Sequence, residues 1–376
     1  MFFLRSILLV IVAGIITAGC APRDARSSGS GIQVQDYTAE AYGWADSLVS
    51  DMTVDQRVGQ LFMPALYASA DPATLRLAAE YASQDHVGGV VLLKGDSEGA
   101  TRIADTLASL AGGVPHWVSV DAETGLAMRL SDAPSMPVAS ELGKSADGQK
   151  MYELGVELAR QSRARGINMI LGPVLDVEKN PSGYIGRRSY GADPELVAEL
   201  GVGFARGLED SGVISVAKHF PGHGSADGDS HRGLPVIAEP LSFLQREALP
   251  PFEEYIGSGL SAVMVGHLAV SAIDPAMRSA SLSGAVITDL LRGDLGFKGL
   301  VITDALNMDG ATSSGSSGST AVEALIAGAD IILSPRDTRK EIEAVKSALA
   351  AGILTDSLIA ARVRRVLFYK YRFLNP

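Results

Sequence analysis

Residues 218–231 read KHFPGHGSADGDSH and combine three histidines, two aspartates and a lysine with three glycines. An imidazole, with an ordinary pKa of about 6.5, can take up or release a proton at neutral pH. Asp229 stands two residues before His231, so its carboxylate can orient that ring and raise its basicity. Because glycine adopts backbone conformations closed to other residues, the segment can bend sharply. We therefore predict a loop that carries proton-transfer groups.

Further ionisable residues come directly after short apolar runs or in the loops next to them. They are Asp121, Asp176, Arg188, Lys218, His219, His267 and Asp304. In a barrel of parallel strands, the loops at the carboxyl ends of the strands build the active site, so these residues predict one shared site. Taken singly, Asp304 fits a helix N-cap equally well, and His267 fits a buried structural histidine better. Asp227 is better explained as a solvated loop residue.

The apolar runs are short and mostly do not alternate with polar residues, as expected of parallel strands covered on both faces. They occupy residues 60–66, 87–93, 116–120, 168–171, 213–217, 261–266, 299–303 and 330–333. Helical patterns separate them; Asp193-Pro194, for example, reads as an N-cap followed by proline at the first helical position, and Gly212 ends that helix.

Eight strands that alternate with helices predict an α/β fold, a (β/α)8 TIM-type barrel that forms a single catalytic domain. An open doubly wound sheet is the alternative architecture. That sheet favours a GxGxxG phosphate turn after an early strand, and the sequence has none there.

The first twenty residues have the features of an export signal. Arg5 precedes an apolar run over residues 7–16 that is short for a membrane span, and small residues then lead to Cys20. Ala18-Gly19-Cys20 resembles the lipobox of bacterial lipoproteins, although Thr17 stands where that pattern usually has leucine. An ordinary signal peptide or a single anchor helix is the alternative.

We accordingly expect a lipoprotein-type signal peptide at residues 1–20, a flexible tether at 21–35 and the catalytic domain at 36–376. Lipidation of Cys20 would anchor the exported protein to a membrane of the cell envelope. Cys20 is the only cysteine, so the chain forms no internal disulfide and has no cysteine-based metal site. A net charge of −11 argues against nucleic acid as a partner.

Five segments together resemble glycoside hydrolase family 3, in particular its β-N-acetylhexosaminidase branch. KHFPGHG followed by DSH resembles the signature loop of that branch. The other segments are LVSDMTVDQRVGQLFMPAL (48–66), VSVDAETGLAMRL (118–130), IGRRSYGADP (185–194) and GFKGLVITDALNM (296–308). They occur in the family's order and cover most of the chain, which makes the resemblance specific.

The resemblance implies a role for each matching residue and implies no metal or other cofactor. Asp304 would be the nucleophile that forms a covalent glycosyl-enzyme, and His231, oriented by Asp229, would be the acid/base. The residues implied to bind the sugar are Asp121, Arg129, Arg188, Lys218 and His219. Two departures leave subsite details open: Glu123-Thr124-Gly125 replaces an acidic residue followed by two glycines, and Ala305 stands where the branch often has aspartate.

We therefore predict a retaining, exo-acting β-N-acetylhexosaminidase that removes terminal N-acetylglucosamine from muropeptide or chitin-derived oligosaccharides. A family-related β-glucosidase and a phosphorylase of N-acetylglucosaminides are the nearest alternatives. A metal-dependent barrel hydrolase would need a close histidine pair after an early strand, and the first three runs offer none. A non-catalytic binding lipoprotein would not need the set formed by Asp304, His231 and Asp229.

Overall fold

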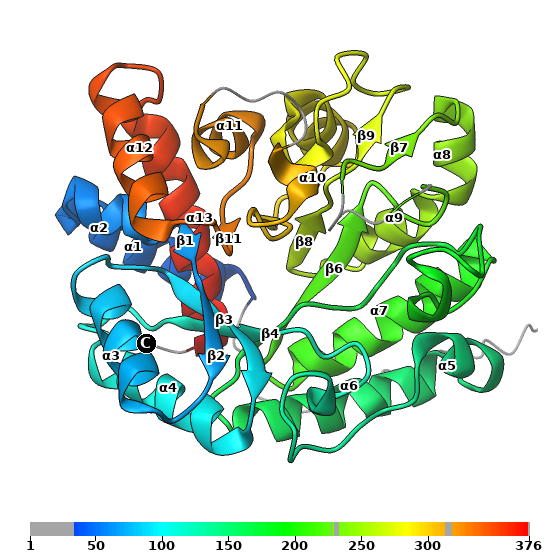
Figure 1. Ribbon diagram of the computed structural model, residues 1–376, viewed down its shortest axis with the longest axis horizontal. Helices are drawn as coiled ribbons and strands as arrows, with labels where there is room; N and C mark the ends of the chain where they lie inside the picture. Colours follow the sequence, from blue (N-terminus) through cyan, green and yellow to red (C-terminus); the bar gives the residue numbers. More distant parts are fainter. Residues whose placement is uncertain (1–33, 227, 229–232, 313–317, 375–376) are drawn as a thin grey trace, which may run out of the picture.

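The computed structural model describes residues 34–226, 228, 233–312 and 318–374. Seven strands form one parallel, curled sheet in the order β10-β8-β6-β5-β4-β3-β2 (Figure 1). These strands are β2 (Ala65–Ala68), β3 (Gly89–Gly95), β4 (Trp117–Val120), β5 (Met169–Ile170), β6 (Ile214–Phe220), β8 (Ala262–Val265) and β10 (Leu300–Thr303). Two further parallel pairs join β1 (Phe62–Met63) to β11 (Ile332–Leu333) and β7 (Val236–Ile237) to β9 (Ala269–Val270).

Every apolar run predicted to be a strand contains one, and the first run contains β1 and the start of β2. All residues of β6, β8 and β10 are buried, which explains why these segments lack an alternating pattern. The predicted α/β class is therefore confirmed as a curled parallel sheet. Beyond the seven-stranded sheet, a single parallel bridge joins Ile302 of β10 to Ile331, the residue before β11.

Helices cover the outside of the sheet (Figure 1). The helices that follow the strands in sequence, or flank them, include α3 (Pro72–Ser83), α4 (Ser97–Ser109), α6 (Gly148–Arg163), α7 (Pro194–Asp210), α9 (Pro250–Gly257), the π-helix η4 (Ala285–Asp294), α11 (Thr320–Ala327), α12 (Thr338–Ala350) and α13 (Asp356–Leu374). The predicted start of α7 is confirmed, because the Asp193 side chain accepts the backbone N–H of Glu195 and Pro194 occupies the first turn.

Helices α6 and α7 lie unusually close to each other. A Cβ atom at Gly207 would stand 2.1 Å from the carbonyl oxygen of Tyr152, and one at Gly155 would stand 2.3 Å from that of Phe204. Only glycine permits this approach of two backbones. Helix α7 in turn packs on strand β6, the strand that carries Lys218 and His219.

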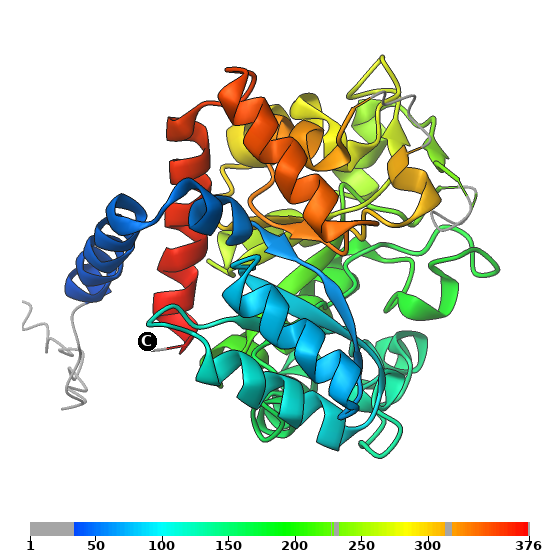
Figure 2. The ribbon, with the colours of Figure 1, turned by 60° about the vertical axis from the view of Figure 1, so that its left-hand side comes forward.

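The first described helix, α1 (Val34–Asp51), packs along α13, so segments from both ends of the chain lie side by side (Figure 2). The rings of Tyr42 and Phe368 stack with centroids 4.4 Å apart, and Asp46 pairs with Arg364. No described helix is long and apolar enough to span a membrane. The predicted signal peptide, Cys20 and nearly all of the tether lie outside the described residues.

A buried ion cluster stabilises the end of the sheet opposite the carboxyl ends of the strands. Asp330, which just precedes β11, is fully buried and accepts the N–H of Val301 at 2.9 Å. Its carboxylate also pairs with Arg292 at 2.6 Å and with Arg365, and Arg362 lies 3.7 Å away. One buried carboxylate is thus the shared partner of three guanidinium groups that are largely removed from water.

We expect Asp330→Asn to lower the free energy of unfolding by about 3 kcal/mol, because the arginines would lose their buried counter-charge. Urea denaturation at neutral pH measures the change. Asp46→Asn is the matched control, since it breaks an exposed pair and should cost less than about 1 kcal/mol. Losses of equal size in the two variants would show that Asp330 stabilises no more than a surface charge does.

Candidate active site

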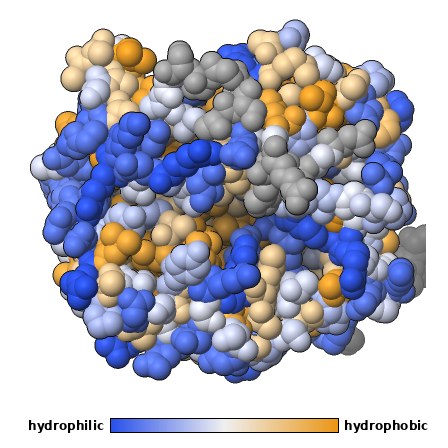
Figure 3. Space-filling model, viewed as in Figure 1, coloured by the Kyte–Doolittle hydropathy of each residue, from blue (hydrophilic) through white to orange (hydrophobic). Residues whose placement is uncertain are grey.

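A cavity of about 490 Å3 opens at the carboxyl ends of the parallel strands. Its lining comes from β3, β6, β8 and β11 and from the segments that follow β4, β5, β10 and β11. A hollow is visible near the middle of the face shown in Figure 3. The predicted sugar-binding residues and the predicted nucleophile all line this cavity: Asp121, Arg129, Arg188, Lys218, His219 and Asp304.

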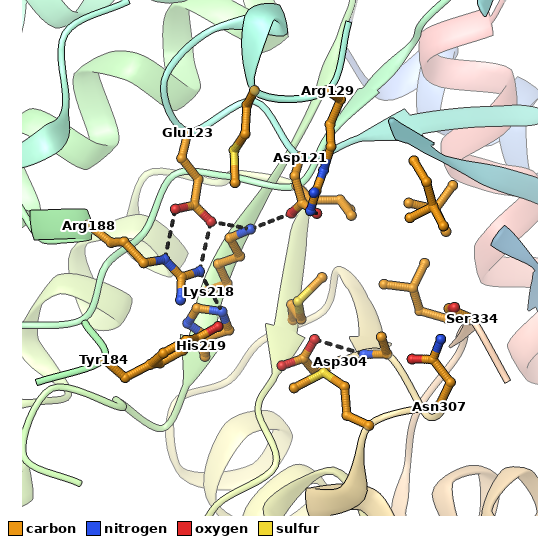
Figure 4. Close-up of a pocket in the computed structure, with 18 residues that line it drawn as sticks. Asp121, Glu123, Arg129, Tyr184, Arg188, Lys218, His219, Asp304, Asn307 and Ser334 are labelled. Carbon is orange, nitrogen blue, oxygen red and sulfur yellow. Dashed lines mark hydrogen bonds and ion pairs between the residues drawn. The ribbon is translucent and has the colours of Figure 1, made fainter. Parts of the chain in front are cut away.

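Lys218 lies at the centre of the charged wall of this cavity (Figure 4). Its ammonium group lies 2.7 Å from Asp121 Oδ1 and 2.7 Å from Glu123 Oε1, and its side chain is only 3% exposed. Burial alone would lower the pKa of Lys218, but the two carboxylates outweigh this effect and raise it. Lys218 therefore remains a cation while buried.

Two arginines complete this wall. Arg188 donates two hydrogen bonds to Glu123, at 2.9 and 2.8 Å, and Arg129 pairs with Asp121. Burial alone would raise the pKa of both carboxyls, but the neighbouring cations hold the pKa of Asp121 and of Glu123 below their ordinary values. The wall thus presents fixed ionic donors and acceptors, the kind of groups that bind polar ligands.

His219 is held by a carboxylate that does not line the cavity. Its Nδ1 lies 2.7 Å from Asp176 Oδ2, and the backbone N–H groups of His219 and His223 also donate to Asp176. Arg188 Nη2 lies 3.4 Å from His219 Nε2. The Asp176 carboxylate therefore holds the His219 ring from behind, with the Nε2 edge of the ring towards Arg188.

Asp304 follows β10 and lies in the same cavity, on the side facing His219 and Lys218 (Figure 4). Its Oδ1 accepts the backbone N–H of Ala305 at 2.8 Å. Burial would raise the pKa of Asp304, but His267, His219 and Lys218 lower it below the ordinary value. Asp304 is therefore an ionised carboxylate within a largely enclosed site.

The imidazole of His267 holds the backbone next to Asp304, which fits the interpretation of His267 as a buried structural histidine. It is fully buried, with Nδ1 2.8 Å from Ser281 Oγ and Nε2 3.0 Å from the carbonyl oxygen of Ala305. This contact fixes the residue after Asp304. Asp304 itself does not cap a helix that begins directly after it, because α10 (Asp309–Thr312) starts five residues later.

One detail of the sequence prediction is wrong. The end of the apolar run at residue 217 predicts that Lys218 and His219 come after the strand, but both lie within β6. The strand extends past the apolar run because it continues to pair, with Leu175 N–H donating to Lys218 O and Gly266 N–H donating to Phe220 O. Hydrogen bonding across the sheet therefore outweighs the polar character of these two residues.

Several residues of the cavity were not predicted, namely Glu123, Tyr184, Asn307 and Ser334. Glu123 had a usable signal, since it stands two residues after Asp121 and such spacing in extended chain places side chains on one side. Tyr184 lies against Arg188, whose guanidinium carbon is 4.7 Å from the centre of the tyrosine ring. Tyr184 stands just before the segment 185–194, so no recognised motif pointed to it.

The predicted acid/base pair, Asp229 and His231, lies outside the described residues, as does Asp227. Within the described ranges, no group of three or more His, Cys, Asp or Glu side chains is arranged to hold a metal ion. The described part of the predicted site therefore consists of Asp304 and the charged wall.

Comparisons with known proteins agree with this geometry. The family model described as "Glycosyl hydrolase family 3 N terminal domain" matches residues 53–368. The "Beta-hexosaminidase LpqI" of Mycobacterium tuberculosis is 38% identical over 301 residues, which is 76% of this chain and 76% of that protein.

Two solved structures extend the comparison. A glycoside hydrolase family 3 β-N-acetylglucosaminidase from Paenibacillus sp. is 36% identical with a TM-score of 0.79, over 86% of this chain and 63% of that chain. This chain thus spans less than two thirds of that longer protein. A "Beta-glucoside phosphorylase BglX" has a TM-score of 0.84 at 23% identity, over 90% of this chain and 62% of that chain, and shows the shared fold alone. The match to the family model over most of the chain establishes that this protein belongs to glycosyl hydrolase family 3 and is a glycoside hydrolase.

Proposed function

We propose that the protein is a retaining, exo-acting β-N-acetylhexosaminidase that releases terminal N-acetyl-β-glucosamine from muropeptide or chitin-derived oligosaccharides. The observation that supports this most is the position of Asp304, an ionised carboxylate in one cavity with a wall of paired acids and bases. The hexosaminidase names of the similar proteins support the choice of sugar.

The charged wall would hold the terminal sugar. Asp121 would accept hydrogen bonds from its hydroxyls, Arg129, Arg188 and Lys218 would donate to the remaining oxygens, and His219 would bind the sugar through its ring edge. Because these groups are already paired with one another, they are held in place before the substrate arrives.

Asp304 would attack the anomeric carbon. Since Oδ1 accepts the Ala305 N–H, Oδ2 would form the C–O bond as the bond to the leaving oxygen breaks. His231, oriented by Asp229, would give its proton to that leaving oxygen. In the second step it would take a proton from water, whose oxygen attacks the anomeric carbon and restores Asp304.

The proposal extends to architecture and location. The Ile302–Ile331 bridge and the β1–β11 pair lie where a closed (β/α)8 barrel would join the two edges of the sheet, and both support such closure. We further propose residues 1–20 as a signal peptide, Cys20 as a lipidation site, residues 21–35 as a tether to a membrane of the cell envelope and residues 36–376 as the catalytic domain.

We expect Asp304→Ala and His231→Ala to reduce cleavage of an aryl N-acetyl-β-glucosaminide severely. The loss should be on the order of 10³-fold or more for the nucleophile, and about 10²- to 10⁴-fold for the acid/base. Release of the aryl group measures turnover, and an aryl β-glucoside should be a much poorer substrate for the unchanged protein. Asp294→Asn, an exposed carboxylate on η4, is the matched control and should keep full activity.

Undiminished activity in Asp304→Ala would remove the nucleophile assignment. Preference for the aryl β-glucoside would favour the β-glucosidase alternative, and no turnover of either glycoside would favour a binding lipoprotein.

A separate experiment distinguishes hydrolysis from phosphorolysis. A histidine acid/base repels incoming phosphate less than a carboxylate would, so both reactions are compatible with the predicted dyad. We expect free N-acetylglucosamine as the only sugar product, whether or not inorganic phosphate is added. Chromatography of the products against the sugar 1-phosphate measures this, and a phosphate-dependent shift to the 1-phosphate would establish a phosphorylase instead.

A further inference from the structure

A second cavity, of about 510 Å3, adjoins the candidate active site. The two cavities share three lining residues, Leu93, Asn307 and Ser334. They are therefore compartments of one continuous depression at the carboxyl ends of β2, β3 and β11. None of the residues proposed above for catalysis or terminal-sugar binding lines the second compartment.

Tyr67 is the most unusual residue of this second compartment. It stands next to the end of β2, and 63% of its surface is exposed. The pairing of β2 with β3 shifts register between Tyr67 and Ala68, a type of irregularity that redirects side chains near functional sites. An exposed aromatic ring on a rigid strand offers an apolar face to a ligand at little cost in conformational entropy.

Ser334 forms the boundary between the two compartments. Its backbone has a φ of 44°, in the left-handed region that residues other than glycine rarely adopt. Hydrogen bonds hold it there, from its own N–H to Met63 O at 2.8 Å and from Asn307 N–H to its carbonyl oxygen at 3.0 Å. Strained conformations of this kind cluster at ligand-binding positions.

The direction of the substrate follows from the first compartment. Figure 4 shows Arg188 and Tyr184 on one side of Asp304, and Asn307 and Ser334 on the other. The terminal sugar would fill the side of the cavity that holds Arg188 and Tyr184. The rest of the substrate must therefore extend from Asp304 in another direction. The side that holds Asn307 and Ser334 continues into the second compartment, which is large enough for a sugar ring.

The charges around this compartment indicate a neutral ligand. Arg336 is paired with Asp309 at 2.7 Å, and Arg339 is paired with both Glu80 and Asp85 at 2.9 Å. Carboxylates thus already accompany both cations of the lining, and an anionic ligand would have to compete with them. A neutral sugar ring requires no such exchange.

We propose that Tyr67 and the cavity beside it form the subsite for the leaving group, where a neutral sugar such as a second N-acetylglucosamine stacks on the Tyr67 ring. This inference rests on the function proposed above and adds to it a determinant of the preferred substrate. The subsite acts only in the first step, because the leaving group has departed before water attacks the glycosyl-enzyme.

The test compares kcat/KM for chitotriose and for N-acetyl-β-glucosaminyl fluoride, whose leaving group is too small to stack on the Tyr67 ring. We expect Tyr67→Ala to lower kcat/KM for chitotriose about tenfold and to change the value for the fluoride less than about twofold. Tyr67→Phe should retain the activity on chitotriose, since it keeps the ring. Tyr152→Ala removes a tyrosine from the distant α6–α7 surface and is the matched control.

Several outcomes would overturn the subsite. One is an equal effect of Tyr67→Ala on both substrates, or no effect on either, while the unchanged protein cleaves both. Another is a loss of activity in Tyr67→Ala that grows as the N-acyl group on the terminal sugar of an aryl substrate is lengthened. That result would show that the compartment holds the N-acyl group and not the leaving group. Absence of cleavage by the unchanged protein would instead contradict the proposed function. Thermal unfolding checks that each variant is folded.

Discussion

The site depends on one buried cation, Lys218, held between two carboxylates. A buried ammonium group is costly unless it is paired and hydrogen-bonded, and here Asp121 and Glu123 each approach it to 2.7 Å. Arg129 and Arg188 then pair with these same two carboxylates. The wall thus carries three cations and two anions, and the Asp304 carboxylate lies in the same cavity.

This network can exist because the sheet brings distant segments to one edge. The carboxyl ends of parallel strands face the same way, so residues that come after β4, β5 and β10 meet residues of β6. Contacts beneath the cavity fix their orientation: Asp176 holds His219, and His267 holds the peptide after Asp304. The ligand therefore meets groups whose positions are already set, which is the condition for efficient catalysis.

The positions of the strands and the gathering of Asp121, Arg188, Lys218, His219 and Asp304 could be predicted from sequence, because both depend on apolar runs and on the polar residues next to their carboxyl ends. Arg129 was implied only by the resemblance to the family. Contacts across the fold left no such signal. Glu123 is recognisable as a partner only once Lys218 and Arg188 are seen beside it, and the role of Ser334 depends on its backbone angle. Tyr67 looks like any strand residue until the neighbouring cavity is known. Closure of the barrel and the geometry of Asp229 and His231 stay predictions.

The most direct measurement asks which atom the sugar becomes attached to. The reagent is an N-acetylglucosaminyl fluoride that carries a second fluorine at C5. It should transfer its sugar quickly to the nucleophile as an ester, and this ester should hydrolyse slowly, so that the glycosyl-enzyme accumulates. Digestion and fragmentation mass spectrometry, which separates Asp304 from Asp309 on one peptide, should then locate one fluoro-sugar on Asp304. A label on any other residue, or rapid turnover of the reagent with inversion at the anomeric carbon and no label, would contradict the account.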